Sequence, residues 1–270
     1  MNIKYGNTEV ILCRDADEMG RTTADLVSTV MRSLLSKQAE VRIVLAAAES
    51  QVPFLDALAI QPGIAWNRVV CFNMDDLWDP GMSAQLSCGA ITLKHLYKKV
   101  CPKAFHLVKH NALDPEEEAL RFEALLRSCA PLDITCQGIG RSGHIALNEP
   151  DCVDFRDQRW VRVVDIAETS KQQLLDDPNF RALGHIPAQG ITMTLTALFS
   201  ARQVYTIVPF ASKRPILTKL FNTQVPTPGL PASILSERQG LLLIDRESCP
   251  AELLSKFDAP VDSIAVTNPE

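Results

Sequence analysis

The stretch EVILCRDADEMGRTTADLVSTVMRSLLSKQAEVRIVLA, residues 9–46, combines two short apolar runs with a longer segment of helical periodicity. The runs at 9–13 and 41–46 are apolar, rich in β-branched residues and bounded by polar ones, as is typical of buried strands. Between them, residues 15–37 place apolar side chains at helical spacing, and Asp15 or Asp17 can cap the start of the helix. The stretch therefore predicts a β-α-β unit.

Similar patterns continue along the chain. Four more apolar runs, at 69–72, 132–136, 204–208 and 241–244, predict strands, and residues 115–127 predict a helix with Pro115 and three acidic residues in its first turn. Strands separated by helices predict an α/β fold: a single doubly wound, mainly parallel, Rossmann-like sheet with helices on both faces. We find neither a repeat nor a linker and interpret the Pro-rich stretch 225–231 as a loop, so residues 1–270 are predicted to form one domain.

Composition excludes several classes of protein. The chain has 270 residues, of which 46% are hydrophobic and 22% charged, which excludes collagen-like, low-complexity and mostly disordered proteins. Its formal charge is −5 without a run of Lys or Arg, which argues against nucleic acid as a partner but allows a small anionic ligand to bind locally. We expect no metal, because the eight scattered cysteines lack a C-x-x-C pair or a His at ligand spacing.

The same cysteines are interpreted as small buried apolar residues in a reducing compartment. The N-terminal residues lack the apolar core of a signal peptide, and no stretch reaches the roughly 18 apolar residues of a membrane span. We therefore expect a cytoplasmic protein without a membrane partner.

Ligands of such sheets bind beyond the carboxyl ends of the strands, and the residues that follow three of the predicted strands are unusual. Asn73-Met74-Asp75-Asp76 follows the run at 69–72. An isolated Asp-Asp pair is most often a turn or a helix cap. The functional alternative is a general base whose pKa is raised by the apolar strand ends around it.

The run at 132–136 is followed by QGIGRSGHIALNEP, residues 137–150. Its glycines allow a tight turn and a close approach to a ligand, and they place His144 and Glu149 around one loop. The spacing of Gly138, Gly140 and Gly143 also fits a dinucleotide-binding fingerprint. We reject that interpretation, because such a fingerprint opens a long helix and Asn148-Glu149-Pro150 cuts this segment short.

The run at 41–46 is followed by AAESQVPFLDAL, residues 47–58. Ser50 can act as the N-cap of a helix that has Pro53 in its first turn. The free N–H groups of such a helix start attract anions such as phosphate. A simple capped helix and a phosphate site are equally compatible with this segment.

In combination, these segments resemble a known family. Phe72-Asn73-Met74-Asp75-Asp76 together with residues 138–150 resembles the glucosamine-6-phosphate deaminase (isomerase) family, in the superfamily that also holds 6-phosphogluconolactonases and ribose-phosphate isomerases. The resemblance runs from about residue 8 to about 248 and includes Ala211-Ser212-Lys213 and residues 231–235. Asn148-Glu149-Pro150 after the histidine looks like the deaminase branch, whose reaction needs no cofactor.

The resemblance implies a role for four residues in catalysis. Asp75 would move a proton between C2 and C1 of the opened sugar, His144 would assist ring opening, and Glu149 would orient that histidine. At the position before Gly143, well-known deaminases carry an aspartate, whereas this chain has Ser142. A hydroxyl can hydrogen-bond the ring oxygen of the sugar but cannot hold the negative charge that stabilises an imidazolium, so we expect slower ring opening or a different substrate.

The resemblance also implies five substrate-binding residues, which are Ser50, Gln51, Gly140, Lys213 and Lys171. The phosphate would meet the helix start at Ser50 and Gln51 and the point charge of Lys213, with Lys171 as a second contact. The usual Gly- and Thr-rich phosphate loop is replaced by an Ala-Ala-x-Ser-Gln loop, as in a divergent branch of the family. Within it, Glu49 brings a negative charge close to the expected phosphate.

The leading hypothesis is an amino-sugar-phosphate deaminase/isomerase that converts a hexosamine 6-phosphate to a ketose 6-phosphate and ammonia. One alternative is a 6-phosphogluconolactonase-like hydrolase, which would use His144 to activate water and would not need Asp75. Others are aldose-ketose isomerisation without loss of ammonia and a catalytically weak sugar-phosphate-binding regulator, which Ser142 and Glu49 both favour. The sugar epimer is left open, and a homo-oligomer is compatible with the superfamily.

Overall fold

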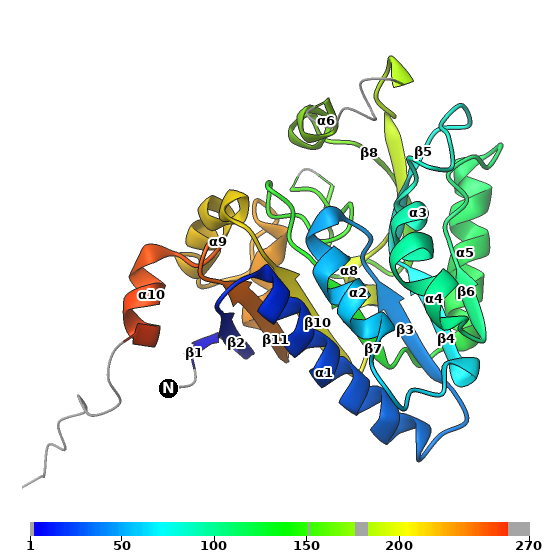
Figure 1. The fold of residues 1–270 in the computed structure, drawn as a ribbon. Helices are drawn as coiled ribbons and strands as arrows, with labels where there is room; N and C mark the ends of the chain where they lie inside the picture. The colour runs from blue at the N-terminus through cyan, green and yellow to red at the C-terminus, as the bar shows by residue number, and fades with distance from the viewer. Residues whose placement is uncertain (1–2, 151, 176–182, 259–270) are drawn as a thin grey trace, which may run out of the picture.

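The computed structural model describes residues 3–150, 152–175 and 183–258 (Figure 1). Its larger sheet has eight strands within these residues, in the order β1-β2-β11-β10-β7-β3-β4-β6. All neighbours pair in parallel except β1, which is antiparallel to β2. The bounds are β1 Ile3–Tyr5, β2 Thr8–Cys13, β11 Gly240–Asp245, β10 Gln203–Val208, β7 Ile134–Gln137, β3 Val41–Leu45, β4 Val69–Asn73 and β6 Ala104–His106.

Helices cover both faces of this sheet, which confirms the predicted doubly wound, mainly parallel architecture. On one face pack α1 (Ala16–Leu35), α2 (Val52–Ala59) and a segment made of α3 (Cys88–Thr92), the π-helical turn η3 (Leu93–Tyr97) and α4 (Lys98–Val100). The other face carries α5 (Pro115–Cys129), α8 (Leu195–Leu198), α9 (Arg214–Phe221) and α10 (Ala251–Asp258). Each face buries its own apolar cluster.

The six predicted strands and both predicted helices are present. Asp15 is the cap of α1, and its side chain accepts a hydrogen bond from the Glu18 N–H. The capping role predicted for Ser50 is wrong, because residues 49–51 form a 3-10 turn and α2 begins only at Val52, with Gln51 as its N-cap. Pro53 does lie in the first turn of α2, as predicted.

The chain reverses its direction of winding at the centre of the sheet. From β3 it proceeds outward to β4 and β6, and from β7 it proceeds the other way to β10 and β11. Leu45 of β3 pairs with Cys136 of β7 on one side and with Asn73 of β4 on the other, so three strands end at the same level. Loops that follow adjacent strands part at such a switch point, which is where ligands of open α/β sheets bind.

A second, three-stranded sheet starts at this carboxyl edge. It consists of β5 (Asp75–Trp78), β9 (Gln189–Met193) and β8 (Val161–Asp165), paired in antiparallel fashion in the order β5-β9-β8. β5 follows β4 after a single residue, so Asp75 lies at the junction of the two sheets. The short helix α6 (Glu168–Leu175) follows β8 and lies beside this sheet at the top of Figure 1.

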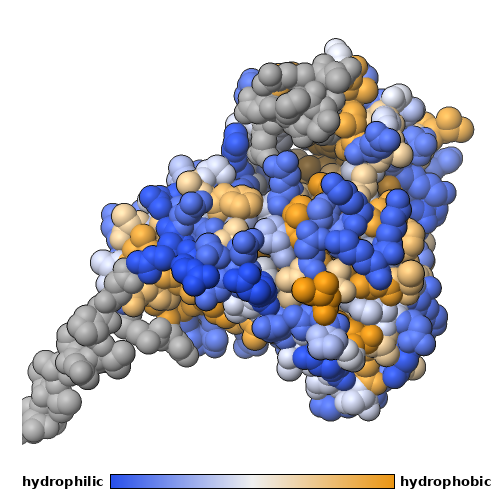
Figure 2. Space-filling view, in the orientation of Figure 1, coloured by the Kyte–Doolittle hydropathy of each residue, from blue (hydrophilic) through white to orange (hydrophobic). Residues whose placement is uncertain are grey.

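The surface is mixed in character. Hydrophilic side chains cover most of the face seen in Figure 2, with apolar ones scattered among them. The exposed large apolar residues come from separate parts of the chain: Ile60, Phe105, Leu113, Leu120, Leu175 and Val225. Scattered apolar exposure of this kind is normal for a globular surface. Among the described helices, none has the length and apolarity needed to cross a membrane.

None of the eight cysteines, all of which lie within the described residues, forms a disulfide. Four of them, at 13, 71, 136 and 249, are buried as predicted, but the prediction is wrong for Cys101 and Cys152, which are exposed. Cys101 ends α4 in a left-handed conformation, with φ 48°, so its side chain lies at a helix end and not in the core.

Candidate functional site

The loop that follows β7 forms the centre of the site. It turns back on itself instead of opening a helix: the Gly143 N–H donates to the Gly140 carbonyl at 3.0 Å, and the Gly140 N–H donates to the His144 carbonyl at 2.9 Å. This local path excludes the dinucleotide fingerprint, which needs a helix start at the last glycine. Gly143 adopts φ +89°, a conformation that favours glycine.

The imidazole of His144 lies directly over Gly140. A Cβ atom at position 140 would be only 1.9 Å from His144 Nε2, so the ring occupies the space that any other residue would fill. The absence of a side chain at Gly140 thus determines where the imidazole can be placed. Gly140 contributes to the site by admitting the ring of His144.

Glu149 holds the other side of this imidazole. Its carboxylate is buried, and Oε1 lies 2.7 Å from His144 Nδ1. Ser142 Oγ donates to Glu149 Oε2 at 2.6 Å and also lies 2.8 Å from His144 Nδ1. Burial raises the pKa of Glu149, but the hydrogen bond and charge of His144 and the hydroxyls of Ser142 and Ser170 outweigh it and lower that pKa to about 2. Glu149 is therefore an anion at neutral pH.

These contacts fix the tautomer of His144. A hydroxyl has one proton, and Ser142 donates it to Glu149, so toward Nδ1 the Ser142 oxygen is an acceptor. An unprotonated Nδ1 would face two oxygen acceptors, whereas a protonated Nδ1 satisfies both. Nδ1 therefore carries the proton, and Nε2 is the atom that can exchange a proton with a ligand.

The sequence left open whether the Asp75-Asp76 pair is a helix cap or a general base, and the structure assigns a different environment to each residue. Asp76 is buried and accepts hydrogen bonds from the N–H groups of Cys88 and Gly89 at the start of α3, at 2.9 and 3.2 Å. Asp75 lies within range of the charge of His144. Burial and then the charge of Asp76 raise the pKa of Asp75 to about 7, while His144 acts in the opposite direction. The cap and the candidate base are thus adjacent residues of β5.

Strand β9 brings Asp75 and the loop of His144 together. Thr192 pairs with Asp75 in the three-stranded sheet, and its hydroxyl accepts a hydrogen bond from the Leu147 N–H at 3.1 Å. The side-chain amide of Asn148 donates to the carbonyls of Ile145 and Met193. One strand therefore anchors both the candidate base and the loop that carries the candidate relay.

The loop that follows β3 reaches the same centre through Gln51. This side chain is buried, and its Nε2 donates to the Ile207 carbonyl of β10 and to Ser50 Oγ, both at 3.2 Å. It crosses Gly138 so closely that a Cβ there would lie 3.0 Å from Nε2. Gln51 Oε1 has no hydrogen-bond partner among the described residues, and a buried amide oxygen of this kind is a candidate for a ligand or water donor.

Lys213 approaches the loop from β10. Its Nζ donates to the Ile139 carbonyl at 2.8 Å, and burial together with the charge of Arg141 lowers its pKa to about 8. The turn that carries it begins at Phe210, which has φ +78° and donates its N–H to the Asp245 carboxylate at 3.0 Å. Two cations thus meet at the glycine loop: Arg141 is a member of it, and Lys213 bonds its Ile139 carbonyl.

Lys171 is placed differently from the other predicted residues. It lies on α6, and its Nζ donates to Glu168 Oε1 at 2.6 Å, one helical turn away. The residue of α6 that contacts the site is its neighbour Ser170, whose hydroxyl donates to Glu149 Oε1. The remaining predicted site residues gather around one loop. Gln51 and Lys213 contact this loop, Asp75 interacts with it through the charge of His144, and Ser50 is linked to it through Gln51.

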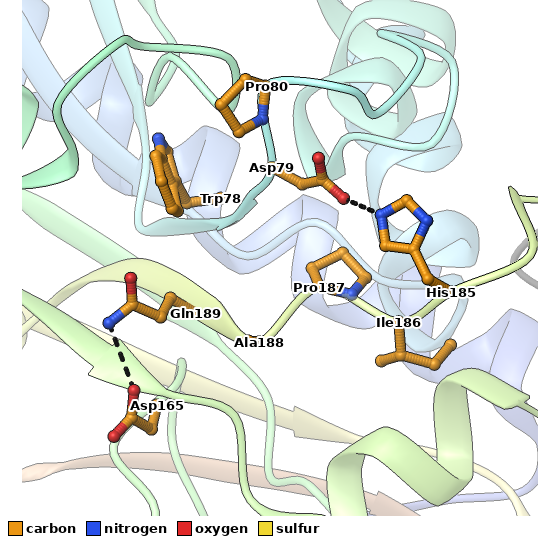
Figure 3. A pocket seen from close by; sticks show the side chains of 9 residues that line it. All are labelled: Trp78, Asp79, Pro80, Asp165, His185, Ile186, Pro187, Ala188 and Gln189. Atoms are coloured by element: carbon orange, nitrogen blue, oxygen red, sulfur yellow. Dashed lines mark hydrogen bonds and ion pairs between the residues drawn. The ribbon is translucent and has the colours of Figure 1, made fainter.

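A pocket of about 410 Å³ lies at the other end of the three-stranded sheet (Figure 3). Asp79 and His185 point toward each other across it and form an ion pair, and Gln189 Nε2 donates to Asp165 Oδ1 at 3.2 Å. None of the predicted site residues lines this pocket. Its two polar contacts instead hold the three-stranded sheet together at this end. His185, which follows α6, pairs with Asp79 after β5, and Asp165 at the end of β8 bonds Gln189 of β9.

Sequence reasoning missed three contributors to the site, namely Asp76 as the carboxylate whose charge raises the pKa of Asp75, Arg141 and Ser170. Arg141 lies inside the quoted glycine motif, so its charge was a signal that could have been used. Ser170 has no local signal, because its partner is 21 residues away. Among the described residues, no three His, Cys, Asp or Glu side chains gather as a metal site.

Comparison with known proteins identifies the family. The profile described as glucosamine-6-phosphate isomerases/6-phosphogluconolactonase matches residues 14–244. Glucosamine-6-phosphate deaminase 2 of Giardia intestinalis is 28% identical over 218 residues, 77% of this chain and 80% of that protein. Glucosamine-6-phosphate deaminase of Bacillus pumilus (strain SAFR-032) is 25% identical over 247 residues, 88% of this chain and 98% of that protein.

Solved structures show the same fold. A monomeric glucosamine-6-phosphate deaminase superposes with a TM-score of 0.77 at 22% identity, covering 88% of this chain and 98% of the other. A 6-phosphogluconolactonase from Thermotoga maritima gives a TM-score of 0.69 at 20% identity, covering 87% and 98%. With a profile match across most of its length and this agreement in fold, the chain belongs to the glucosamine-6-phosphate isomerase/6-phosphogluconolactonase family.

Proposed function

We propose that this protein is an amino-sugar-phosphate deaminase/isomerase that converts a hexosamine 6-phosphate and water to a ketose 6-phosphate and ammonia. The observation that carries the proposal is the pair formed by Asp75 and the His144–Glu149 relay. A carboxyl group with a pKa of about 7 lies close enough to His144 for their charges to interact. Proton transfer next to a carbonyl needs such a base, and the related sequences named deaminases support the same reaction.

The relay would open the sugar ring. His144 Nε2 exchanges the proton that moves between the O1 hydroxyl and the ring oxygen, while Nδ1–H stays bonded to Glu149. The anionic Glu149 stabilises the imidazolium that forms during this transfer. Ser142 is neutral and cannot add a second negative charge, but its hydroxyl bonds both Glu149 and the imidazole and keeps them aligned.

Asp75 would then act on the open-chain aldehyde. Its carboxylate removes the proton from C2, the electron pair forms a C1–C2 double bond, and the aldehyde oxygen takes up a proton. Return of the proton to C1 leaves an imine at C2, which water hydrolyses to the ketone and ammonia. A carboxyl group whose pKa lies near 7 both accepts and returns a proton readily at neutral pH.

The phosphate would be bound by local groups and not by the overall field, because the net charge of the protein is −5. We place it beside the glycine loop, near Lys213 and Arg141, with Ser50 and Gln51 on the side of β3. The side chain of Glu49 is exposed, which leaves it well hydrated. Its charge is therefore screened from this position.

The test is to incubate the protein with glucosamine 6-phosphate and with galactosamine 6-phosphate and to measure ammonia and ketose phosphate together. Equal amounts of both products from either sugar would support the proposal and identify the epimer. Release of ammonia from neither sugar would refute it. Ketose formation from an aldose 6-phosphate that carries a hydroxyl at C2, with no ammonia from either amino sugar, would indicate simple isomerisation. Thermal stabilisation without turnover would indicate a sugar-phosphate regulator.

The lactonase alternative makes a different prediction for the same two residues. Hydrolysis of 6-phosphogluconolactone would need His144 to activate water but would not need Asp75. Lactone hydrolysis that survives Asp75→Asn and is lost in His144→Ala would therefore replace the deaminase proposal.

Lys213→Ala should weaken binding of the phosphorylated sugar. Loss of a charge-assisted contact to phosphate is expected to raise KM for the hexosamine 6-phosphate by about 10- to 100-fold, with little effect on binding of the unphosphorylated sugar. Because the pKa of Lys213 is lowered to about 8, KM in the unaltered protein should also rise as pH increases through 8 and the ammonium loses its proton.

The matched control is Lys219→Ala, which removes an exposed lysine of α9 and should leave KM unchanged. Equal loss of affinity for phosphorylated and unphosphorylated sugars in Lys213→Ala would show that this residue does not contact the phosphate.

Asp76→Asn should shift the pH profile of kcat/KM. The base must be deprotonated to act, so kcat/KM of the unaltered protein should rise with pH around 7. Removing the charge of Asp76 lowers the pKa of Asp75, and this rise should therefore move to lower pH. Asp17→Asn, an identical change at an exposed residue of α1, should leave the profile in place. An unshifted profile in Asp76→Asn would show that the two carboxylates are not coupled.

A further inference from the structure

The hydroxyl of Ser170 is directed away from its own helix and toward the relay. Ser170 lies in the first turn of α6, where its backbone N–H bonds the Ala167 carbonyl. Serine hydroxyls within helices often bond a carbonyl of the preceding turn. Here Ser170 Oγ instead donates to Glu149 Oε1 at 2.5 Å, across a sequence separation of 21 residues.

Glu149 thereby receives three hydrogen bonds. His144 Nδ1 and Ser170 Oγ donate to Oε1, and Ser142 Oγ donates to Oε2. Ser142 and His144 belong to the same loop as Glu149, so they move together with it. Ser170 comes from the connection between β8 and β9 and ties the carboxylate to a second part of the protein.

The hydrogen bond from Ser170 affects the orientation of the Glu149 carboxylate. Rotation of the terminal carboxylate of a glutamate about χ3 is soft, so its plane is set by the donors that surround it. His144 Nδ1–H points to the same oxygen that Ser170 bonds, which means that the position of Oε1 determines how the imidazole is held. The hydroxyl of Ser170 therefore sets the position of Glu149 Oε1, and this oxygen in turn orients the imidazole of His144.

The connection that carries Ser170 is anchored independently of this bond. Ile166 follows the end of β8 and Ala188 precedes the start of β9. The Ile166 N–H donates to the Ala188 carbonyl at 2.8 Å and so joins the two ends of the connection. His185 forms its ion pair with Asp79, the residue after β5 (Figure 3). Leu174 of α6 packs on the small apolar cluster of Leu77, Met82 and Ile166. Loss of the Ser170 hydroxyl should therefore leave α6 in place and remove one hydrogen bond.

We propose that Ser170 is a positioning residue for the His144–Glu149 relay, acting through Glu149 Oε1 from outside the glycine loop. The inference rests on the proposed function, in which His144 moves a proton of the sugar. It assigns to α6 a role in the chemistry, through Ser170, that is separate from the phosphate contact predicted for Lys171. Ser170 itself touches neither the substrate nor the reacting atoms.

The kinetic test compares Ser170→Ala with Ser170→Thr and Thr169→Ala. Loss of one hydrogen bond to a charged group should lower kcat in Ser170→Ala by about tenfold, with KM within about twofold of the unaltered protein. Threonine keeps the hydroxyl and should restore most of kcat. Thr169→Ala removes an exposed hydroxyl from the adjacent position of α6 and should change neither constant.

A second measurement tests the positioning without turnover. In protein labelled with ¹⁵N-histidine, the proton on His144 Nδ1 should give a downfield resonance that shifts in Ser170→Ala and stays unchanged in Thr169→Ala. Failure of the deaminase proposal would be seen as absence of ammonia, while this resonance would still report on the contact. An unmoved resonance with unchanged kcat, or a rise in KM at constant kcat, would refute the positioning role.

Discussion

Asp75→Asn is expected to reduce kcat for hexosamine 6-phosphate by roughly 10²- to 10⁴-fold, because an amide cannot accept the C2 proton. The protein should still fold, since burial already favours the neutral form of this carboxyl group, as its raised pKa shows. Substrate binding should persist, because Lys213 and the glycine loop are untouched. The variant should therefore bind the sugar phosphate and fail to turn it over.

Isotope exchange separates this effect from a general loss of activity. With substrate deuterated at C2, the unaltered protein should release or transfer the label, whereas Asp75→Asn should leave it in place while ring opening continues. Melting temperatures of the two proteins, with and without substrate, check folding and binding. A variant that keeps more than a tenth of kcat would show that Asp75 is not the base.

The fold could be predicted because its signals are local. Each of the six apolar runs is a strand of the large sheet, since a buried parallel strand is apolar along its whole length. The three-stranded sheet was not predicted, because charged residues at 162 and 165 interrupt the short apolar run of β8. β5 is four residues long and carries the Asp-Asp pair, which resembles a turn when it is taken alone.

The site was predictable where its residues share one loop. Gly140, Ser142, His144 and Glu149 are close in sequence, and their spacing together with the resemblance indicated a relay. The wrong cap at Ser50 arose because Pro53 fits the first turn of a helix that starts at 51 or at 52 equally well. The contact of Gln51 with Ile207 spans 156 residues and could not be derived from either segment.

The role of Ser142 depends on a contact that no sequence motif specifies. From the sequence, replacement of an acid by a hydroxyl suggested a weakened relay. In the structure, that hydroxyl and Ser170 both bond Glu149, which stays anionic with a pKa of about 2. Glu149 thus supplies a negative charge beside the imidazole of His144 without an acid at position 142.

Gly140→Ala is expected to abolish most of the activity although the change is a single methyl group. The new Cβ would lie 1.9 Å from His144 Nε2, so the ring must leave its position. The chain can still fold, because the obstructing group is a side chain that can rotate. When it rotates, Nδ1 loses Glu149, and misplacement by about 1 Å is enough to cost roughly 10²-fold in kcat.

A double-mutant cycle tests this explanation. If Gly140→Ala acts only through the imidazole, it should add little further loss to His144→Ala, and the two effects should be strongly non-additive. Gly229→Ala is the matched control: its Cβ would meet only Thr227 Oγ1 at 3.9 Å, an ordinary contact, and kcat should stay unchanged. Additive losses would mean that position 140 contacts the substrate directly, as the sequence first suggested. A side chain at this position would then impair activity in two ways, by displacing His144 and by blocking the substrate.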